Sequence, residues 1–321
     1  MLQRRPFSRF VGCCLLALSL AACGGSGAPA QKTEVRAAST PRGVAKRLEI
    51  DPRIGVYTST PWGFSTASYW IEGPSGLIFI DTQFLLSAAE EAMDAAESLT
   101  GKKIALAIVL HPNPDKFNGT ALFQARGIRV VTSAQVLAKI PAVHKMRKDA
   151  FYDRYKPDYP TDAAKPESFG ETDQELSAAG LKVKARVLGP GCSAAHVVVE
   201  YEGHAFVGDL VGNGTHAWIE IGEIEQWIKR LAEIAEAKPT FVHPGRGKSA
   251  GPELLEWETA YLNRLLAEIA TEKPTWPAAP GAIENVRSRM VKAYPALSFD
   301  AFLDVGLEEV FRKQAEKAAR Q

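Results

Sequence analysis

Four polar residues that follow an apolar run have side chains suited to metal binding or acid–base chemistry. The run covers residues 104–110, and His111, Asn113, Asp115 and Lys116 come directly after it. Imidazole nitrogen and carboxylate oxygen are common metal ligands, whereas a protonated lysine amine has three donors and no lone pair. The segment therefore combines residues that bind a cation with one that opposes it.

Five short segments between residues 78 and 247 resemble, in order and spacing, the metal-binding segments of the metallo-β-lactamase superfamily. They are Ile78–Thr82, His111–Gly119, Gly189–Ser193, Phe206–Leu210 and Val242–Gly247. The family writes the second segment as His-x-His-x-Asp-His after an apolar strand. Here His111 and Asp115 match, whereas Asn113 and Lys116 stand in place of histidines. The resemblance implies an α/β fold, a four-layer αββα sandwich with additional C-terminal helices.

The resemblance also implies roles for single residues. A first metal would be held by His111, Asn113 and Cys192, and a second by Asp115, Lys116 and Arg246, with Asp209 bridging. The second set cannot bind a cation, because Lys116 lacks a lone pair while protonated and Arg246 stays protonated. We expect both cations to pair with Asp115 and Asp209 instead, since buried carboxylates without partners are costly.

The first set of ligands keeps some residues that can bind a metal. His111 is a good ligand and a Cys192 thiolate is a softer one, whereas Asn113 is a poor ligand. Two alternatives stay open for the cofactor: no metal, or one zinc ion on His111, Cys192 and Asp209. In a metal-free enzyme, the Cys192 thiolate would be the nucleophile, with its pKa lowered by the nearby cations.

Other polar residues are assigned to the substrate or to structure. The candidate catalytic residues are Asp115, Lys116, Cys192 and Arg246, and the candidate substrate contacts are Asn113, Asn118 and His216. A histidine at the position of His216 lines the cleft in related sequences, and a structural role stays open. The other histidines are given no catalytic role: His196 is interpreted as a surface or core residue, His243 as a support for its loop, and His144 and His204 as solvent-exposed.

The N-terminus predicts export and a lipid anchor. Arg4, Arg5 and Arg9 precede an apolar run over residues 10–20, and Leu20-Ala21-Ala22-Cys23 resembles a bacterial lipobox. Residues 1–22 would be the signal peptide and Cys23 the lipidated first residue; an ordinary secretory signal is the alternative. Gly24 in second place indicates the outer membrane, facing the periplasm. The lipid would supply the membrane contact.

Composition divides the rest of the chain. Residues 23–47 read as a flexible tether, 48–272 as the metallo-β-lactamase-like domain, and 273–321 as a helical extension. Removing the three signal arginines lowers Lys plus Arg from 38 to 35 against 37 Asp plus Glu, so the mature charge is about −2. That balance gives no indication of a nucleic-acid partner.

Periodicity predicts the elements that position the site. Strands are expected at 68–72, 76–81, 104–110, 128–132, 181–188, 197–201, 205–207 and 240–243. Helices are expected at 86–99, 119–125, 224–235 and 253–272, with two more within 283–320. A further helix should begin after the cap Ser133 and end or kink at Pro141, and residues 152–173 should form a long loop.

Three functions compete at this point. The first is a catalytically silent envelope lipoprotein whose cationic cleft holds an anionic small molecule. The second is a hydrolase of an ester, amide or lactam that uses one zinc ion or the Cys192 nucleophile, with Lys116 or Arg246 stabilising the oxyanion. The third is a structural envelope protein that uses the 152–173 loop as a contact surface.

Overall fold

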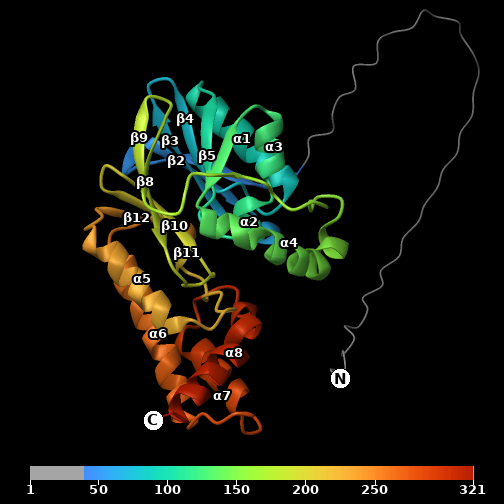
Figure 1. Ribbon diagram of the computed structural model, residues 1–321, viewed down its shortest axis with the longest axis vertical. Helices are drawn as coiled ribbons and strands as arrows, with labels where there is room; N and C mark the ends of the chain where they lie inside the picture. The colour runs from blue at the N-terminus through green and yellow to red at the C-terminus, as the bar shows by residue number, and fades with distance from the viewer. Residues whose placement is uncertain (1–39, 321) are drawn as a thin grey trace, which may run out of the picture. The chain divides into compact units, whose positions relative to one another are not determined.

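The computed structural model describes residues 40–320, and two β-sheets packed face to face form its centre (Figure 1). The expected signal peptide, the expected lipidation site Cys23 and residues 23–39 of the expected tether lie outside the described residues. No helix among residues 40–320 is both long enough and apolar enough to cross a membrane.

The first sheet has seven strands in sequence order. They are β1 (Gly43–Leu48), β2 (Asp51–Ser59), β3 (Ala67–Gly73), β4 (Gly76–Ile80), β5 (Ile104–Ile108), β6 (Arg129–Thr132) and β7 (Glu167–Ser168). Strands β1 to β4 pair antiparallel, and β4 to β7 pair parallel. Parallel neighbours need a crossover, which α1 (Leu86–Thr100) provides between β4 and β5.

The second sheet has five strands in the order β12-β11-β10-β9-β8. They are β8 (Gln174–Ala178), β9 (Leu181–Leu188), β10 (His196–Tyr201), β11 (His204–Gly212) and β12 (Phe241–Arg246). Alternate side chains of β10 enter different cores, because neighbouring side chains of a strand point to opposite faces. Val197 and Val199 belong to the core shared with the first sheet, and Val198 belongs to the core beneath the helices.

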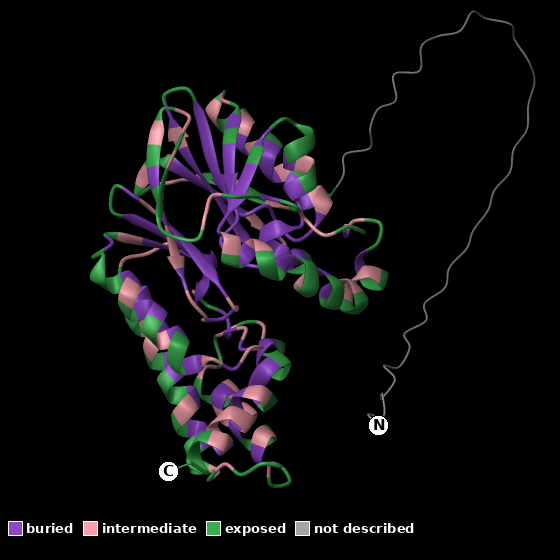
Figure 2. Ribbon diagram, in the orientation of Figure 1, coloured by how far each residue is buried: buried purple, intermediate pink, exposed green. Residues whose placement is uncertain are grey.

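Helices cover both outer faces and extend the second one. Helices α1 and α3 (Thr120–Ala125) pack on the first sheet, and α5 (Ile224–Glu236) and α6 (Glu253–Thr271) pack on the second. Helices α7 (Ala282–Ala293) and α8 (Ala301–Ala318) continue from α6, with buried residues on their shared faces (Figure 2). The predicted αββα sandwich with C-terminal helices is confirmed.

Two local predictions differ from the structure. Gly43 to Arg47, expected at the end of the tether, lie in β1, which pairs with β2. Helix α4 (Ala134–Tyr155) begins after the Ser133 cap as predicted but runs through Pro141. Its buried residues Val136, Ile140 and His144 recur at helical spacing, so packing along one face offsets the hydrogen bond that Pro141 removes.

Two histidines expected at the surface are buried instead. His144 and His204 are 5% and 4% exposed. His204 Nδ1 lies 2.9 Å from His243 Nε2, whose Nδ1 lies 2.8 Å from Ser249 Oγ. These contacts tie β11 to the loop after β12, which agrees with the structural role predicted for His243.

Candidate functional site

Buried polar side chains from both sheets meet where the strands end. Asp81 follows β4, His111 follows β5, Asp209 lies on β11 and Arg246 ends β12. Asp81 adopts a left-handed backbone conformation with φ of 63°, which is uncommon for a residue with a side chain. Its Oδ1 accepts a hydrogen bond of 2.9 Å from the Leu110 amide, so the turn is held against the neighbouring strand end.

Lys116 occupies the centre of this group. It lies on the short helix α2 (Pro114–Phe117), which Pro114 opens with a backbone angle already suited to a first turn. The Lys116 side chain is fully buried, with Nζ 3.0 Å from Asp115 Oδ2 and 2.9 Å from Asp209 Oδ1. A third carboxylate oxygen, Oδ2 of Asp81, is 3.9 Å away. One ammonium group therefore serves three carboxyl groups.

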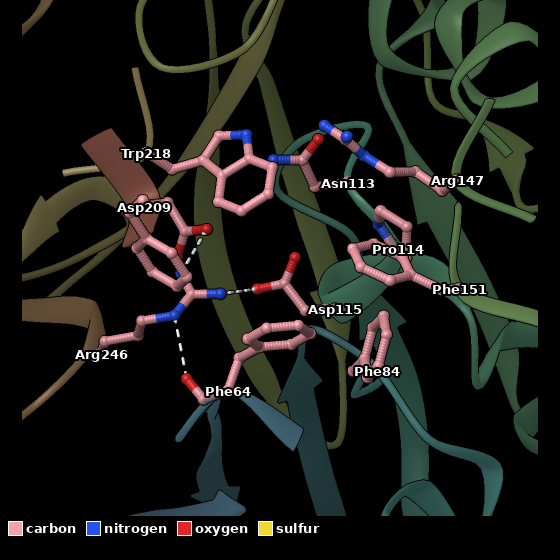
Figure 3. Close-up of a pocket in the computed structure, with 11 residues that line it drawn as sticks. Phe64, Phe84, Asn113, Pro114, Asp115, Arg147, Phe151, Asp209, Trp218 and Arg246 are labelled. Carbon is pink, nitrogen blue, oxygen red and sulfur yellow. Dashed lines mark hydrogen bonds and ion pairs between the residues drawn. The ribbon is translucent and has the colours of Figure 1, made fainter. Parts of the chain in front are cut away.

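Arg246 also joins the carboxylates of Asp209 and Asp115 (Figure 3). Its Nη1 is 2.6 Å from Asp209 Oδ2 and its Nη2 is 2.9 Å from Asp115 Oδ2. Its Nε donates a hydrogen bond of 3.0 Å to the Phe64 carbonyl oxygen. The predicted pairing of Lys116 and Arg246 with Asp115 and Asp209 is confirmed.

The close approach of β11 and β12 depends on Gly245. A Cβ atom at this position would lie 2.0 Å from Asp209 Oδ1 and 2.7 Å from the Gly208 carbonyl carbon. Neither distance is tolerable, so only glycine lets Asp209 keep its place between Lys116 and Arg246.

The ion pairs leave the site close to electrically neutral. Burial favours a raised pKa for Asp209, but Arg246 and Lys116 outweigh it and hold the pKa well below its usual range. Burial raises the pKa of Asp81 to about 8 against the opposing effect of Lys116, so this carboxyl group is mainly protonated at pH 7. Two cations thus face two carboxylates, and their charges cancel. The prediction that these residues make the cleft cationic is therefore wrong.

A second group, of His111, Cys192 and His196, lies beside the ion pairs. All three are buried, and one potential ligand atom of each lies within 4.8 Å of the others. Cys192 Sγ is 3.8 Å from His196 Nε2, which also accepts a 3.1 Å hydrogen bond from the Ser193 amide. His196, interpreted from sequence as an ordinary surface or core residue, is therefore in the core and in contact with the thiol.

The environment of Cys192 keeps its thiol protonated. Burial, followed by the carboxylate of Asp209, raises the pKa of Cys192 well above its usual value, and Lys116 opposes this only in part. The prediction that the pKa of Cys192 is lowered is wrong, because burial and then Asp209 outweigh the lowering effect of Lys116. The thiol is also only 1% exposed, so a substrate has no direct route to it.

The metal set predicted from sequence is brought together only in part. His111 Nε2 lies 3.6 Å from Asp209 Oδ2, and His111 Nδ1 lies 3.2 Å from Ser193 Oγ. Both oxygens of Asp209 are within 3 Å of a Lys116 or Arg246 nitrogen, at 2.9 Å and 2.6 Å. Both oxygens of Asp209 are thus already paired with cationic side chains of the protein itself.

An aromatic cleft of about 30 Å³ opens onto the ion pairs. Asn113, Asp115 and Arg246 line it as expected for cleft residues. Sequence reasoning missed its apolar wall, which consists of Phe64, Phe84, Phe151, Trp218 and Phe302 (Figure 3 labels the first four). These residues come from five separate parts of the chain, and no local pattern marks them.

The remaining candidate contacts divide between structure and a neighbouring cavity. Asn118 does not line the cleft; its Nδ2 donates a 2.9 Å hydrogen bond to the Phe84 carbonyl oxygen and fixes the cleft wall. His216 lines an adjoining cavity of about 10 Å³, together with Glu258, which sequence reasoning did not single out.

Comparison with known proteins identifies the family. The family model of the metallo-beta-lactamase superfamily matches residues 61–246, more than half of the chain and all of the ion-pair residues. The chain belongs to the metallo-β-lactamase superfamily. A search of curated proteins gave no significant match.

Solved metallo-β-lactamases share the fold. A metallo-beta-lactamase from Pontibacter korlensis superposes with a TM-score of 0.55 at 18% identity, over 68% of this chain and 99% of that one. The enzyme FIM-1 from Pseudomonas aeruginosa, in its mono-zinc form, gives a TM-score of 0.54 at 20% identity, over 70% and 97%. A metallo-beta-lactamase from Hirschia baltica gives 0.55 at 20% identity, over 69% and 98%. At these identities the likeness concerns the fold alone.

The two-metal arrangement implied by the superfamily does not fit these residues. A cation between Asp115 and Asp209 would meet the Lys116 ammonium and the Arg246 guanidinium, which already contact both carboxylates. The group of His111, Cys192 and His196 does offer nitrogen and sulfur donors of the kinds that zinc prefers. A single metal is therefore the most that the described donors could hold.

Proposed function

We propose that this protein is a metal-independent member of the metallo-β-lactamase superfamily that binds a small molecule and does not hydrolyse it. The observation that carries the proposal is the position of Lys116 Nζ, 2.9 Å from Asp209 and 3.0 Å from Asp115. Lys116 and Arg246 supply two fixed positive charges to the carboxylates, so the carboxylates are stable without a metal ion.

Metal content tests this proposal. Elemental mass spectrometry of protein purified without chelator should find no stoichiometric zinc. The variant carrying Asn113→His, Lys116→His, Cys192→His and Arg246→His should acquire zinc, because it restores the family's ligands on an intact sandwich. One zinc per wild-type chain would contradict the proposal, and a quadruple variant that folds but binds no zinc would contradict the placement of the site.

A mononuclear hydrolase is the second candidate. It is favoured by His111, Cys192 and His196, whose donor atoms lie within 4.8 Å of one another. A zinc ion there would polarise an ester, amide or lactam carbonyl and lower the pKa of its bound water. This candidate predicts about one zinc per chain in the wild type and its loss in Cys192→Ala and in His196→Ala.

We also propose that the protein is anchored by lipid at Cys23 to the outer membrane and faces the periplasm. The support is the Arg-rich start, the apolar run and the Leu20-Ala21-Ala22-Cys23 sequence. Expression in bacteria with a radiolabelled fatty acid should label the wild type, and Cys23→Ser should remove both the label and the membrane association. A wild type that stays unlabelled and soluble would refute the anchor.

A further inference from the structure

A chain of four side chains ends in a serine hydroxyl, away from the ion pairs. Asp51 begins β2, His204 begins β11, His243 lies on β12, and Ser249 follows β12. Asp51 Oδ2 lies 3.4 Å from His204 Nε2, and His204 Nδ1 lies 2.9 Å from His243 Nε2. His243 Nδ1 lies 2.8 Å from Ser249 Oγ. An imidazole is thus placed against a hydroxyl group and is itself held by a third group, the arrangement that activates a serine nucleophile.

The backbone after β12 sets Ser249 beside His243. Gly247 has a φ of 87°, a left-handed conformation that suits glycine and reverses the chain. Beyond this turn, Ala250 pairs antiparallel with Val242 through backbone hydrogen bonds of 2.8 Å and 3.2 Å. The contact between Ser249 and the imidazole is therefore fixed by backbone pairing on the strand that carries His243.

The direction of the hydrogen bonds in this chain follows from the charges. The hydrogen bond from Arg53 lowers the pKa of Asp51, so Asp51 is a carboxylate that only accepts. Burial lowers the pKa of His204 and lowers that of His243 to about 3, so both rings are neutral at pH 7. His204 then carries its hydrogen on Nε2, toward Asp51, and accepts at Nδ1 from His243. His243 Nδ1 is left to accept the hydrogen of Ser249.

A groove of about 440 Å³ gives Ser249 the access that Cys192 lacks. Its volume falls within the range of small-molecule sites, about 300–1,000 Å³. Leu48, Ile50 and Val56 supply the apolar part of its lining. Within residues 40–320, no residue lines both this groove and the aromatic cleft or the cavity that adjoins the cleft. The groove is therefore a separate site.

Two cations without a partner border the same groove. Lys46 and Lys248 line it, are exposed, and take part in no ion pair within the part of the chain that the structure describes. The other charged residues of the lining are Glu49 and Arg47, and Arg47 is already paired with a carboxylate of β3. Lys248 directly precedes Ser249, so its ammonium group can stabilise negative charge that develops on a carbonyl oxygen at the serine.

We propose that Ser249 and His243 form a metal-free esterase site in this groove, with Ser249 as the nucleophile and His243 as the general base. His204 and Asp51 are positioning residues that hold the imidazole in the required tautomer. The substrate is a short-chain carboxylic ester, whose acyl group packs on the apolar part of the lining. This activity goes beyond the binding function proposed for the ion-pair site and uses none of that site's residues.

The reaction balances with water as the only co-reactant. Ser249 Oγ forms a bond to the acyl carbon while its proton passes to His243 Nδ1. The bond between the acyl carbon and the alcohol oxygen then breaks, and that oxygen takes the proton from His243. Water hydrolyses the acyl-serine by the same steps, which releases a carboxylic acid and restores the hydroxyl group. Because a pKa of about 3 makes His243 a weak base, esters of acidic alcohols such as phenols should react best.

Hydrolysis of p-nitrophenyl acetate by the full-length chain, in buffer that contains EDTA, tests the inference. We expect Ser249→Ala to lower kcat/KM at least about 100-fold and Lys248→Met to lower it about tenfold. His204→Gln should lower kcat about tenfold and leave KM within about twofold, because His204 acts through the imidazole and does not touch the substrate. Ser177→Ala, at an exposed position of β8, is the matched control and should leave kcat/KM unchanged.

A fluorophosphonate probe gives a second measurement, because it reacts with activated serines. Peptide mass spectrometry should find the probe on Ser249 of the native chain. Absence of this label, hydrolysis unchanged in Ser249→Ala, or hydrolysis that EDTA abolishes would each overturn the inference. If Ser249→Ala does not fold, the label on the wild type decides the question. Zinc content bears on the proposed binding function and not on the label, so the two proposals can fail separately.

Discussion

Replacing Lys116 with methionine should cost this protein a large part of its stability. The side chain is fully buried, and its ammonium nitrogen lies 3.0 Å from Asp115 and 2.9 Å from Asp209. At an effective dielectric constant of about 20, each contact contributes about 5 to 6 kcal/mol of attraction before desolvation is counted. Desolvation offsets much of this in the wild type, but Lys116→Met leaves the carboxylates buried with too little positive charge. Breaking a buried pair in this way costs about 3–5 kcal/mol.

Chemical denaturation followed by tryptophan fluorescence measures the free energy of unfolding directly. Lys103→Met is the matched control, because Lys103 is 88% exposed and its ion pair with Glu97 should contribute less than about 1 kcal/mol. The double variant Lys116→Met with Asp115→Asn removes one charge of each sign and should recover part of the loss. A Lys116→Met protein within about 1 kcal/mol of the wild type would refute the argument that Lys116 compensates the carboxylates.

Three further predictions follow from the same region. Burial raises the pKa of Glu258 from 4.5 to about 8. As pH rises, the unfolded chain therefore loses this proton before the folded chain does. The free energy of unfolding falls between pH 4.5 and about pH 8. Glu258→Gln should remove that slope and gain about 3 kcal/mol over the wild type at pH 7, measured against Glu256→Gln; equal slopes would contradict the prediction. Cys192 should react with a thiol reagent only after unfolding, and peptide mass spectrometry that finds it labelled in the native protein would refute its burial. Gly245→Ala should push Asp209 out of place and lower the unfolding free energy by about 1–3 kcal/mol, whereas an unchanged melting temperature would argue against the tight approach of β11 and β12.

Much of the fold could be predicted because local sequence patterns indicate its helices and strands. The apolar run before His111 and the alternation in residues 181–188 correspond to β5 and β9, within two residues at each end. The ion pairs were predictable for a different reason. Once the resemblance places Lys116 and Arg246 beside Asp115 and Asp209, a buried unpaired charge would be too costly. The pairing of the two cations with the two carboxylates could therefore be predicted.

The remaining features depend on contacts between distant parts of the chain. His196 is near Cys192 in sequence, but its burial against His111 follows from how β10 lies beside β5 across the two sheets. The direction of the Cys192 pKa shift depends mainly on the burial of the thiol, which follows from the packing of the two sheets. Phe151 and Phe302 reach the cleft from α4 and α8, which no periodicity within either helix reveals.

Phe302 has a consequence for how this protein could change over evolution. It lies on α8, beyond the matched residues 61–246, and its ring is 5.2 Å from the Arg246 guanidinium carbon. The ion-pair residues of the cleft belong to the sandwich, whereas Phe302 comes from α8, which follows the matched residues. Substitution of Phe302 would thus change the wall of the cleft from outside the matched stretch. One aromatic ring of the cleft wall is therefore encoded outside the matched stretch, whereas the other four lie within it.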